Sequence, residues 1–304
     1  MAQVFTTLNR VSTVSMDAMF TMFQPQINGR PATRKQIEGR IYRCTAGIEP
    51  NKLSNEMIHQ IVEEEREKMP LRRDDQRYWR LLNTEVFRKI LAIAEAPKQR
   101  FHHAAHYAVL AHQKFLSSEE YWFIQPSMHD FLRRLRKQGI RVIIASNHHQ
   151  ESLSKLMKHD GKILEEVDAV YVSETFGVGK AFPEFWEQLI AAEKRVNANF
   201  DPATLVHIGN SPRSDIGACD LDIPFVVYDR ERVLTSFRQL EPEQLASIVF
   251  ADNIDEAVAE QDGPTIIKLS EQQRKRFLDQ YQLGKVVICN TVPELRSTVL
   301  PLAA

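Results

Sequence analysis

Residues 11–21 read VSTVSMDAMFT, an apolar run that ends at Asp17 and is followed four residues later by Thr21. A short apolar run with turn residues after it predicts a buried strand. Open parallel sheets bind ligands beyond the carboxyl ends of their strands, which is where Asp17 would lie. The stretch therefore raises two questions: whether Asp17 is a nucleophile, and what Met19 does two residues further on.

Similar apolar runs recur along the chain, and helical patterns lie between most of them. This alternation predicts βαβ units, and hence an α/β fold with a doubly wound parallel sheet covered by helices on both faces. The further runs are IRVIIA (140–145), DAVYV (168–172), TLVHIG (204–209), PFVVY (224–228) and SIVF (247–250).

Between residues 24 and 125 the alternation stops, and the sequence shows no convincing strand. About 100 residues are too many for a structureless loop inside a compact domain, so this range predicts an all-helical domain inserted into the α/β core. The core then comprises residues 1–23 and 126–262, and residues 263–304 form a βαβα extension at the sheet edge. The helical patterns are NEMIHQIVEEEREK (55–68), QRYWRLLNTEVFRKILAIAE (76–95) and FHHAAHYAVLAHQKFL (101–116).

The composition restricts the classes of partner. With 43% hydrophobic residues, 26% charged residues and a net charge of −1, the 304-residue chain has no excess of Lys and Arg for binding nucleic-acid phosphates. Its three cysteines form no CxxC pair, and no segment approaches the roughly 20 apolar residues that span a bilayer. We expect a cytoplasmic protein that acts on a small molecule and binds neither nucleic acid nor membrane.

Polar residues follow the ends of the predicted strands. Because the carboxyl ends of parallel strands meet at one edge of a sheet, we expect these side chains to lie close together. A carboxylate there can attack an electrophile, and a lysine can stabilise the charge that develops. The residues are Asp17, Thr21, Ser146, Asn147, His148, His149, Lys180, Asn210, Arg213 and Asp215.

Four stretches that contain these residues resemble, in order, the four motifs of the haloacid dehalogenase (HAD) superfamily. The helical stretch stands where that family inserts its cap domain, and residues 121–147 are similar to its helical-cap, phosphatase-like branch. The resemblance covers roughly residues 11–260 and implies a HAD-like Rossmannoid core with a helical cap. The motifs are DAMFT (17–21), IIASN (143–147), SETFGVGKAFPEFW (173–186) and IGNSPRSDIGA (208–218).

The resemblance implies a mechanism and a set of site residues. Asp17 would attack a small, phosphorylated molecule and form an aspartyl intermediate that water hydrolyses. The implied catalytic residues are Asp17, Thr21, Ser146 and Lys180. Mg²⁺ would be held by Asp17, the backbone carbonyl of Met19, Asn210 and Asp215. We further expect an anionic substrate to contact Asn147, His148, His149 and Arg213.

Two positions depart from the family pattern. Phosphatases of the family place an aspartate where this chain has Met19, and that residue protonates the leaving group and activates water. Such help is typically worth roughly 10²–10⁴ in rate, and methionine cannot supply it. Asn210 replaces the first aspartate of the fourth motif, although an amide oxygen can still bind a metal. We therefore expect a site that holds metal and phosphate but turns over slowly.

Three functions remain open from the sequence. A hydrolase of impaired or unusual activity could take its acid from His148 or His149, because histidine titrates near neutrality. A 2-haloacid dehalogenase needs no proton for its leaving halide, but the tyrosine usual in those enzymes is absent at position 19. A catalytically silent descendant would keep the fold for binding or regulation, with the C-terminal extension as a possible surface for a protein partner.

Overall fold

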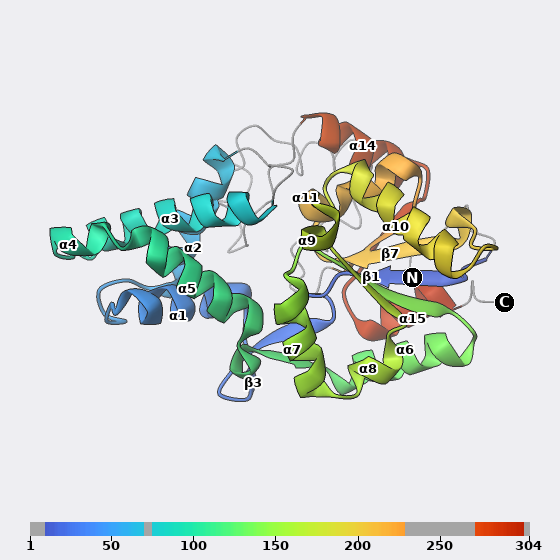
Figure 1. The fold of residues 1–304 in the computed structure, drawn as a ribbon, viewed down its shortest axis with the longest axis horizontal. Helices are drawn as coiled ribbons and strands as arrows, with labels where there is room; N and C mark the ends of the chain where they lie inside the picture. Colours follow the sequence, from blue (N-terminus) through green and yellow to red (C-terminus); the bar gives the residue numbers. More distant parts are fainter. Residues whose placement is uncertain (1–9, 70–74, 229–270, 301–304) are drawn as a thin grey trace.

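The structure, a computed structural model, describes residues 10–69, 75–228 and 271–300. Its main layer is a parallel sheet with the strand order β6-β5-β1-β7-β8-β9 (Figure 1). From β1 the chain runs outward to β5 and β6 and then returns to β7, so the winding reverses between β1 and β7. This is the predicted doubly wound α/β fold. The strands are β1 (Thr13–Met16), β5 (Arg141–Ser146), β6 (Ala169–Val172), β7 (Leu205–Gly209), β8 (Phe225–Tyr228) and β9 (Val286–Cys289).

The strands form where the apolar runs predicted them, because both faces of the sheet are buried. On β5, Ile144 packs with the apolar face of α6 (Pro126–Lys137), whereas its neighbour Ile143 packs with α10 (Pro183–Val196). A strand enclosed in this way needs apolar side chains at successive positions rather than at alternate ones. Figure 1 shows the two layers of helices on either side of the sheet.

The C-terminal residues add to the same sheet. β9 pairs in parallel with β8 and forms one edge of the sheet, and Phe277 of α14 (Glu271–Gln282) packs against that part. The predicted strand SIVF (247–250) lies outside the described residues. The remaining core helices are α7 (Gln150–Asp160), α8 (Ile163–Glu166), α9 (Ser173–Phe176), α11 (Pro212–Asp215) and α15 (Val292–Val299).

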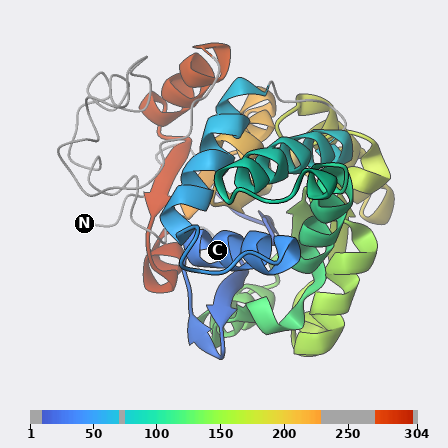
Figure 2. The same ribbon diagram turned by 90° about the vertical axis from the view of Figure 1, so that its left-hand side faces the viewer.

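A group of helices lies beyond the carboxyl ends of the strands, apart from the sheet layers (Figures 1 and 2). We call it the helical insert. The helical pattern over 101–116 corresponds mainly to α5, because a turn at His102 and His103 separates it from Phe101 at the end of α4. Among the described residues, no helix is long and apolar enough to cross a membrane. The helices are α1 (Arg34–Ala46), α2 (Asn55–Lys68), α3 (Asp75–Ile93), α4 (Lys98–Phe101) and α5 (Ala104–Ser117).

The expectation that residues 24–125 contain no strand is wrong. A small antiparallel sheet with the order β3-β2-β4 joins the two connections between the core and the helical insert. Its strands are two to five residues long, and the sequence FQPQI of β2 has no apolar alternation, so no periodic signal marked them. They are β2 (Phe23–Ile27), β3 (Arg30–Pro31) and β4 (Trp122–Ile124).

Candidate active site

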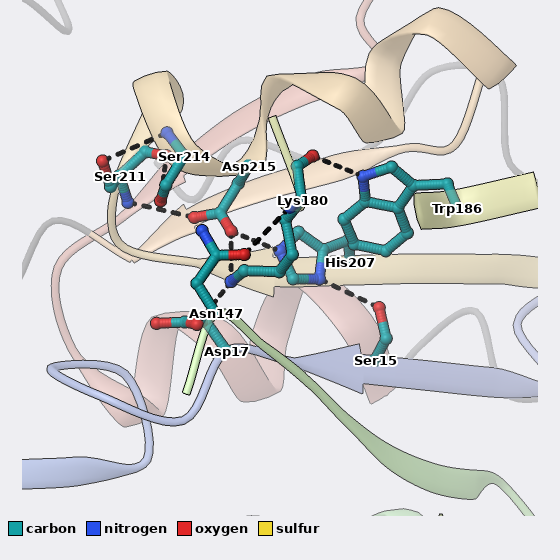
Figure 3. Close-up of polar contacts among 9 residues, drawn as sticks. All are labelled: Ser15, Asp17, Asn147, Lys180, Trp186, His207, Ser211, Ser214 and Asp215. Carbon is teal, nitrogen blue, oxygen red and sulfur yellow. Dashed lines mark hydrogen bonds and ion pairs between the residues drawn. The ribbon is translucent and has the colours of Figure 1, made fainter. Parts of the chain in front are cut away.

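Three buried charged side chains meet at the carboxyl edge of the sheet (Figure 3). Asp17 directly follows β1, and its backbone N–H donates to the carbonyl of Ile208 on β7 at 2.8 Å. It therefore lies between the two strands at which the winding reverses. Lys180 lies in the segment before α10, and Asp215 ends α11. The three residues come from distant parts of the chain and meet where the fold predicts a ligand site.

The ammonium group of Lys180 is shared by the two carboxylates. Its Nζ atom donates a short hydrogen bond to Oδ1 of Asp17 and lies 2.6 Å from Oδ1 of Asp215. Only 1% of Lys180 is exposed, so its charge has lost almost all of its contact with water. A buried charge without a partner is strongly unfavourable, and here each charge has one. Two carboxylates and one ammonium leave the group with a net charge of −1.

The backbone of Lys180 is also fixed from two sides. Its N–H donates to Oδ1 of Asn147 at 2.9 Å, and its carbonyl accepts a hydrogen bond from Nε1 of Trp186 at 2.8 Å. Asn147 follows β5 and Trp186 lies on α10, so this segment is tied both to the sheet edge and to a helix. The contact that the structure gives Asn147 is thus with Lys180, whereas contact with a substrate stays a prediction.

Asp215 is held by the loop that follows β7. Its Oδ2 atom accepts a hydrogen bond from the backbone N–H of Ser211 at 3.2 Å. A Cβ atom on Gly209 would lie 2.3 Å from that oxygen, far inside contact distance. Gly209 therefore lets the carboxylate lie close against the end of the strand. Ser211 also caps α11, since its hydroxyl accepts a hydrogen bond from the N–H of Ser214 at 3.4 Å.

A histidine that was not predicted from the sequence lies against the Asp215 carboxylate. His207 of β7 is completely buried, with Nε2 3.1 Å from Oδ1 of Asp215 and Nδ1 2.9 Å from Oγ of Ser15. The sequence did indicate a buried polar group, because LVHIG (205–209) places a histidine inside an otherwise apolar run. A polar group in such a position needs a partner inside the fold.

The two carboxylates differ in pKa. Burial raises the pKa of Asp17 from 3.8 to about 6, although Lys180 acts in the opposite direction. Burial also acts to raise the pKa of Asp215, but the charge of Lys180 and the contact with His207 outweigh it and hold that pKa well below its ordinary value. Asp215 is thus ionised throughout the neutral range, whereas Asp17 changes charge just below it.

Other predicted site residues lie around this group. Thr21 and Ser146 are buried, and Oγ1 of Thr21 has no hydrogen-bond partner within the described chain. Met19 is 9% exposed and belongs to the main hydrophobic core, and its backbone forms an isolated bridge with Phe23 of β2. Asn210 is partly buried at the end of β7. The Arg213 backbone is part of α11, but its side chain lies outside what the structure describes.

The histidines after β5 connect the core with the helical insert. His148 is buried, and Nε2 of His149 lies 3.3 Å from Nε2 of His112 on α5. Nδ1 of His149 lies 3.4 Å from a carboxylate oxygen of Glu174 on α9. Burial lowers the pKa of His112 to about 3, so this ring is neutral near pH 7. The role of His112 was not predicted, because no spacing in the sequence links residue 112 to residue 149.

The comparison with protein families agrees with this arrangement. Residues 26–219, more than half of the chain, match the family of haloacid dehalogenase-like hydrolases. The chain belongs to this family. The matched range contains Lys180 and Asp215 but begins after Asp17 and Met19. A comparison with curated protein sequences gave no match.

Solved HAD structures are similar to the chain at low sequence identity. YfnB from Bacillus subtilis, described as a HAD-hydrolase bound to magnesium, is 16% identical with a TM-score of 0.52, and the match covers 73% of this chain and 90% of that one. An L-2-haloacid dehalogenase from Xanthobacter autotrophicus is 18% identical with a TM-score of 0.44, covering 78% and 87%. At these identities the likeness to YfnB supports the fold alone.

The oxygen donors of this HAD site match Mg²⁺ in kind. Mg²⁺ prefers carboxylate and carbonyl oxygens and keeps several waters, so few protein ligands are needed. Figure 3 shows one oxygen of Asp17 turned toward Lys180 and the other turned away. Besides this carboxylate, the implied set contains the Met19 carbonyl, the Asn210 amide and Asp215. Within the described residues, no three His, Cys, Asp or Glu side chains cluster as metal ligands. The implied set contains two carboxylates, because its other two members are Met19 and Asn210.

We expect Gly209→Ala to disturb Asp215. The new Cβ would lie 2.3 Å from Oδ2 of Asp215 and 2.9 Å from Nε2 of His207, and overpacking of this kind typically costs about 1–3 kcal/mol. Urea unfolding measures the loss. In an Asp215→Ala background the same change should cost clearly less, since the nearest oxygen is gone. Equal losses in both backgrounds would contradict the close approach.

We expect Asp17→Asn to stabilise the fold in a pH-dependent way. Because the folded pKa of Asp17, about 6, lies above the ordinary 3.8, ionisation of Asp17 favours the unfolded chain. The penalty is absent below about pH 3.8, grows as the pH rises to about 6 and is complete above it. The advantage of the variant in Tm should therefore be larger at pH 7.5 than at pH 4.5.

Asp215→Asn is the matched comparison for this test. The pKa of Asp215 is lowered, so its ionised form stabilises the fold and the substitution should reduce Tm at pH 7.5. An Asp17→Asn variant that is less stable than the native protein at pH 7.5 would show that burial does not dominate at Asp17.

Proposed function

We propose that the chain is a hydrolase that acts on a small anionic molecule, in the first place a phosphate ester, with Asp17 as the nucleophile. The observation that carries the proposal is the buried arrangement of Asp17, Lys180 and Asp215 at the carboxyl edge of the sheet. A structural ion pair would not require two carboxylates on one completely buried lysine at this edge. Perturbed pKa values at such a place are typical of functional sites.

In the proposed chemistry, each of the three buried charged residues has a separate role. Asp17 is mostly ionised above about pH 6 and attacks the phosphorus, which splits the reaction into formation and hydrolysis of an aspartyl intermediate. Lys180 holds the attacking carboxylate in place and offsets negative charge during transfer. Asp215 stays ionised and holds Lys180. A bound Mg²⁺, held by Asp17, Met19 and Asn210 with Asp215, would add positive charge near the transferred group.

Met19 predicts low activity for this hydrolase. Its thioether cannot donate a proton to the leaving group, and its side chain is part of the hydrophobic core. The leaving group must then depart as an anion or take its proton from another residue. His149 is a candidate, since it lies in the loop next to Asn147 and contacts both His112 and Glu174. The same buried methionine also supports the alternative of a catalytically silent protein that binds anions.

The first test is phosphate release from a panel of small phosphate esters with Mg²⁺. We expect slow turnover by the native protein, none by Asp17→Asn, and a rise by Met19→Asp within the roughly 10²–10⁴ typical of a general acid. Esters with good leaving groups should be hydrolysed fastest by the native protein and should gain least from Met19→Asp.

Other outcomes separate the alternatives. Native protein that is inert while Met19→Asp is active would identify a silenced site and favour a binding function. Chloride release from 2-chloropropionate without phosphate release would identify a dehalogenase. Turnover that survives Asp17→Asn would rule out Asp17 as the nucleophile and end the proposal.

The search for the missing acid begins with the two histidines after β5. We expect His148→Gln combined with His149→Gln to lower kcat by roughly 10-fold or more for esters with poor leaving groups, and much less for good ones. His102→Gln combined with His106→Gln is the matched control, because both of those rings are exposed on the helical insert. Unchanged kcat for every ester would exclude both histidines as the acid.

A further inference from the structure

His207 is a buried polar residue for which the proposed chemistry has no task. It lies in the middle of β7, where its backbone pairs directly with Ser15 of β1 in the parallel register. The ring is completely buried and faces Asp215 at one nitrogen and Ser15 at the other (Figure 3). A histidine in the interior of a sheet loses hydration without gaining the packing of an apolar residue, so its contacts must account for it.

The chemistry of its partners fixes which nitrogen carries the proton. An ionised carboxylate can only accept, so Nε2, 3.1 Å from Oδ1 of Asp215, must carry the hydrogen. Nδ1 is then an acceptor and takes the hydroxyl hydrogen of Ser15 at 2.9 Å. The contact with Asp215 lies outside hydrogen-bond geometry, so the N–H of the neutral ring acts on Asp215 through its dipole rather than through an aligned hydrogen bond.

Aromatic neighbours hold the ring in this orientation. Trp186 meets it edge to face with the ring centroids 4.6 Å apart, and Phe225 stacks on it at 5.4 Å. Trp186 also donates to the Lys180 carbonyl, so one indole contacts both the histidine and the lysine segment. The imidazole is thus clamped between two rings and tied to Ser15, with its free N–H directed to Asp215.

We propose that His207, oriented by Ser15, is a positioning residue that holds the Asp215 carboxylate so that Lys180 remains shared between Asp215 and Asp17. The inference rests on the proposed function, in which Asp17 and Lys180 act on the substrate. His207 touches neither Asp17 nor any site a substrate would reach. It acts only through Asp215, whose Oδ1 receives both the lysine and the histidine while Oδ2 is held by Ser211.

The first arm of the test is kinetic. His207→Phe keeps an aromatic ring between Trp186 and Phe225 but removes the N–H, and should lower kcat by roughly 10- to 100-fold with little change in KM, as losses of supporting residues do. His207→Gln can still place an N–H near Asp215 and should recover part of the loss. In an Asp215→Asn background, His207→Phe should cost almost nothing more.

A merely structural role would give a different pattern. The loss from His207→Phe would then be the same in the native and the Asp215→Asn backgrounds, and it would follow the change in Tm; either result overturns the inference. If His207→Phe does not fold, Ser15→Ala serves in its place. Ser15→Ala should give a smaller loss in kcat that again disappears in the Asp215→Asn background.

The second arm does not depend on turnover. Nitrogen-15 NMR of the imidazole at pH 7.5 distinguishes the two ring nitrogens, and the native protein should show a hydrogen on Nε2 and none on Nδ1. Ser15→Ala should shift the ring toward a mixture of tautomers. A native ring protonated at Nδ1 would overturn the inference. If the native protein hydrolyses nothing, the proposed function fails, and this arm alone decides the role of His207.

Discussion

One buried ammonium shared by two buried carboxylates is the interaction on which the rest of this structure depends. Lys180 is 1% exposed and lies against Asp17 and Asp215, so the loss of the lysine would leave two carboxylates inside the protein without a counter-charge. Breaking such a pair typically costs about 3–5 kcal/mol. The lysine thereby fixes three separate segments relative to one another: the end of β1, the segment before α10, and α11. A hydrolytic site built there inherits its geometry from this charge balance.

The backbone around Lys180 leaves room for its ammonium group to contact both Asp17 and Asp215. Gly209 and Gly217 leave room where any side chain would collide, since a Cβ on Gly217 would lie 2.4 Å from the carbonyl of Lys180. The same carbonyl accepts from Trp186, and the N–H of Lys180 donates to Asn147. Because the lysine backbone is held by hydrogen bonds at both of its polar groups, the long side chain needs little additional ordering to reach the two carboxylates.

The sequence predicts those parts of the molecule whose burial requires a recognisable run of apolar residues along the chain. IRVIIA is apolar at successive positions because both faces of β5 are covered, and Asp17, Lys180 and Asp215 were found because they follow such runs. The strand FQPQI was missed because it is short and polar, and its pairing partner lies about 100 residues away along the chain. His207, Ser15 and His112 were missed for a related reason. Their contacts are with residues distant along the chain, which no spacing records, although the polar ring inside the apolar run LVHIG marks His207 as a buried group that needs a partner.

Met19 and Asn210, at positions where the resemblance implies aspartates, have a common electrostatic consequence for the proposed site. With aspartates at positions 19 and 210, one lysine would face four carboxylates, and the folded site would depend on bound cations to offset their repulsion. Met19 and Asn210 leave two carboxylates, which together with Lys180 carry a net charge of −1, and the polar contacts of Asp215 offset part of it. The same two substitutions remove a proton donor and weaken the attraction for a divalent cation. Under the proposed function the two residues remove part of what phosphoryl transfer requires, whereas the pKa of Asp17, about 6, leaves the proposed nucleophile ionised at neutral pH.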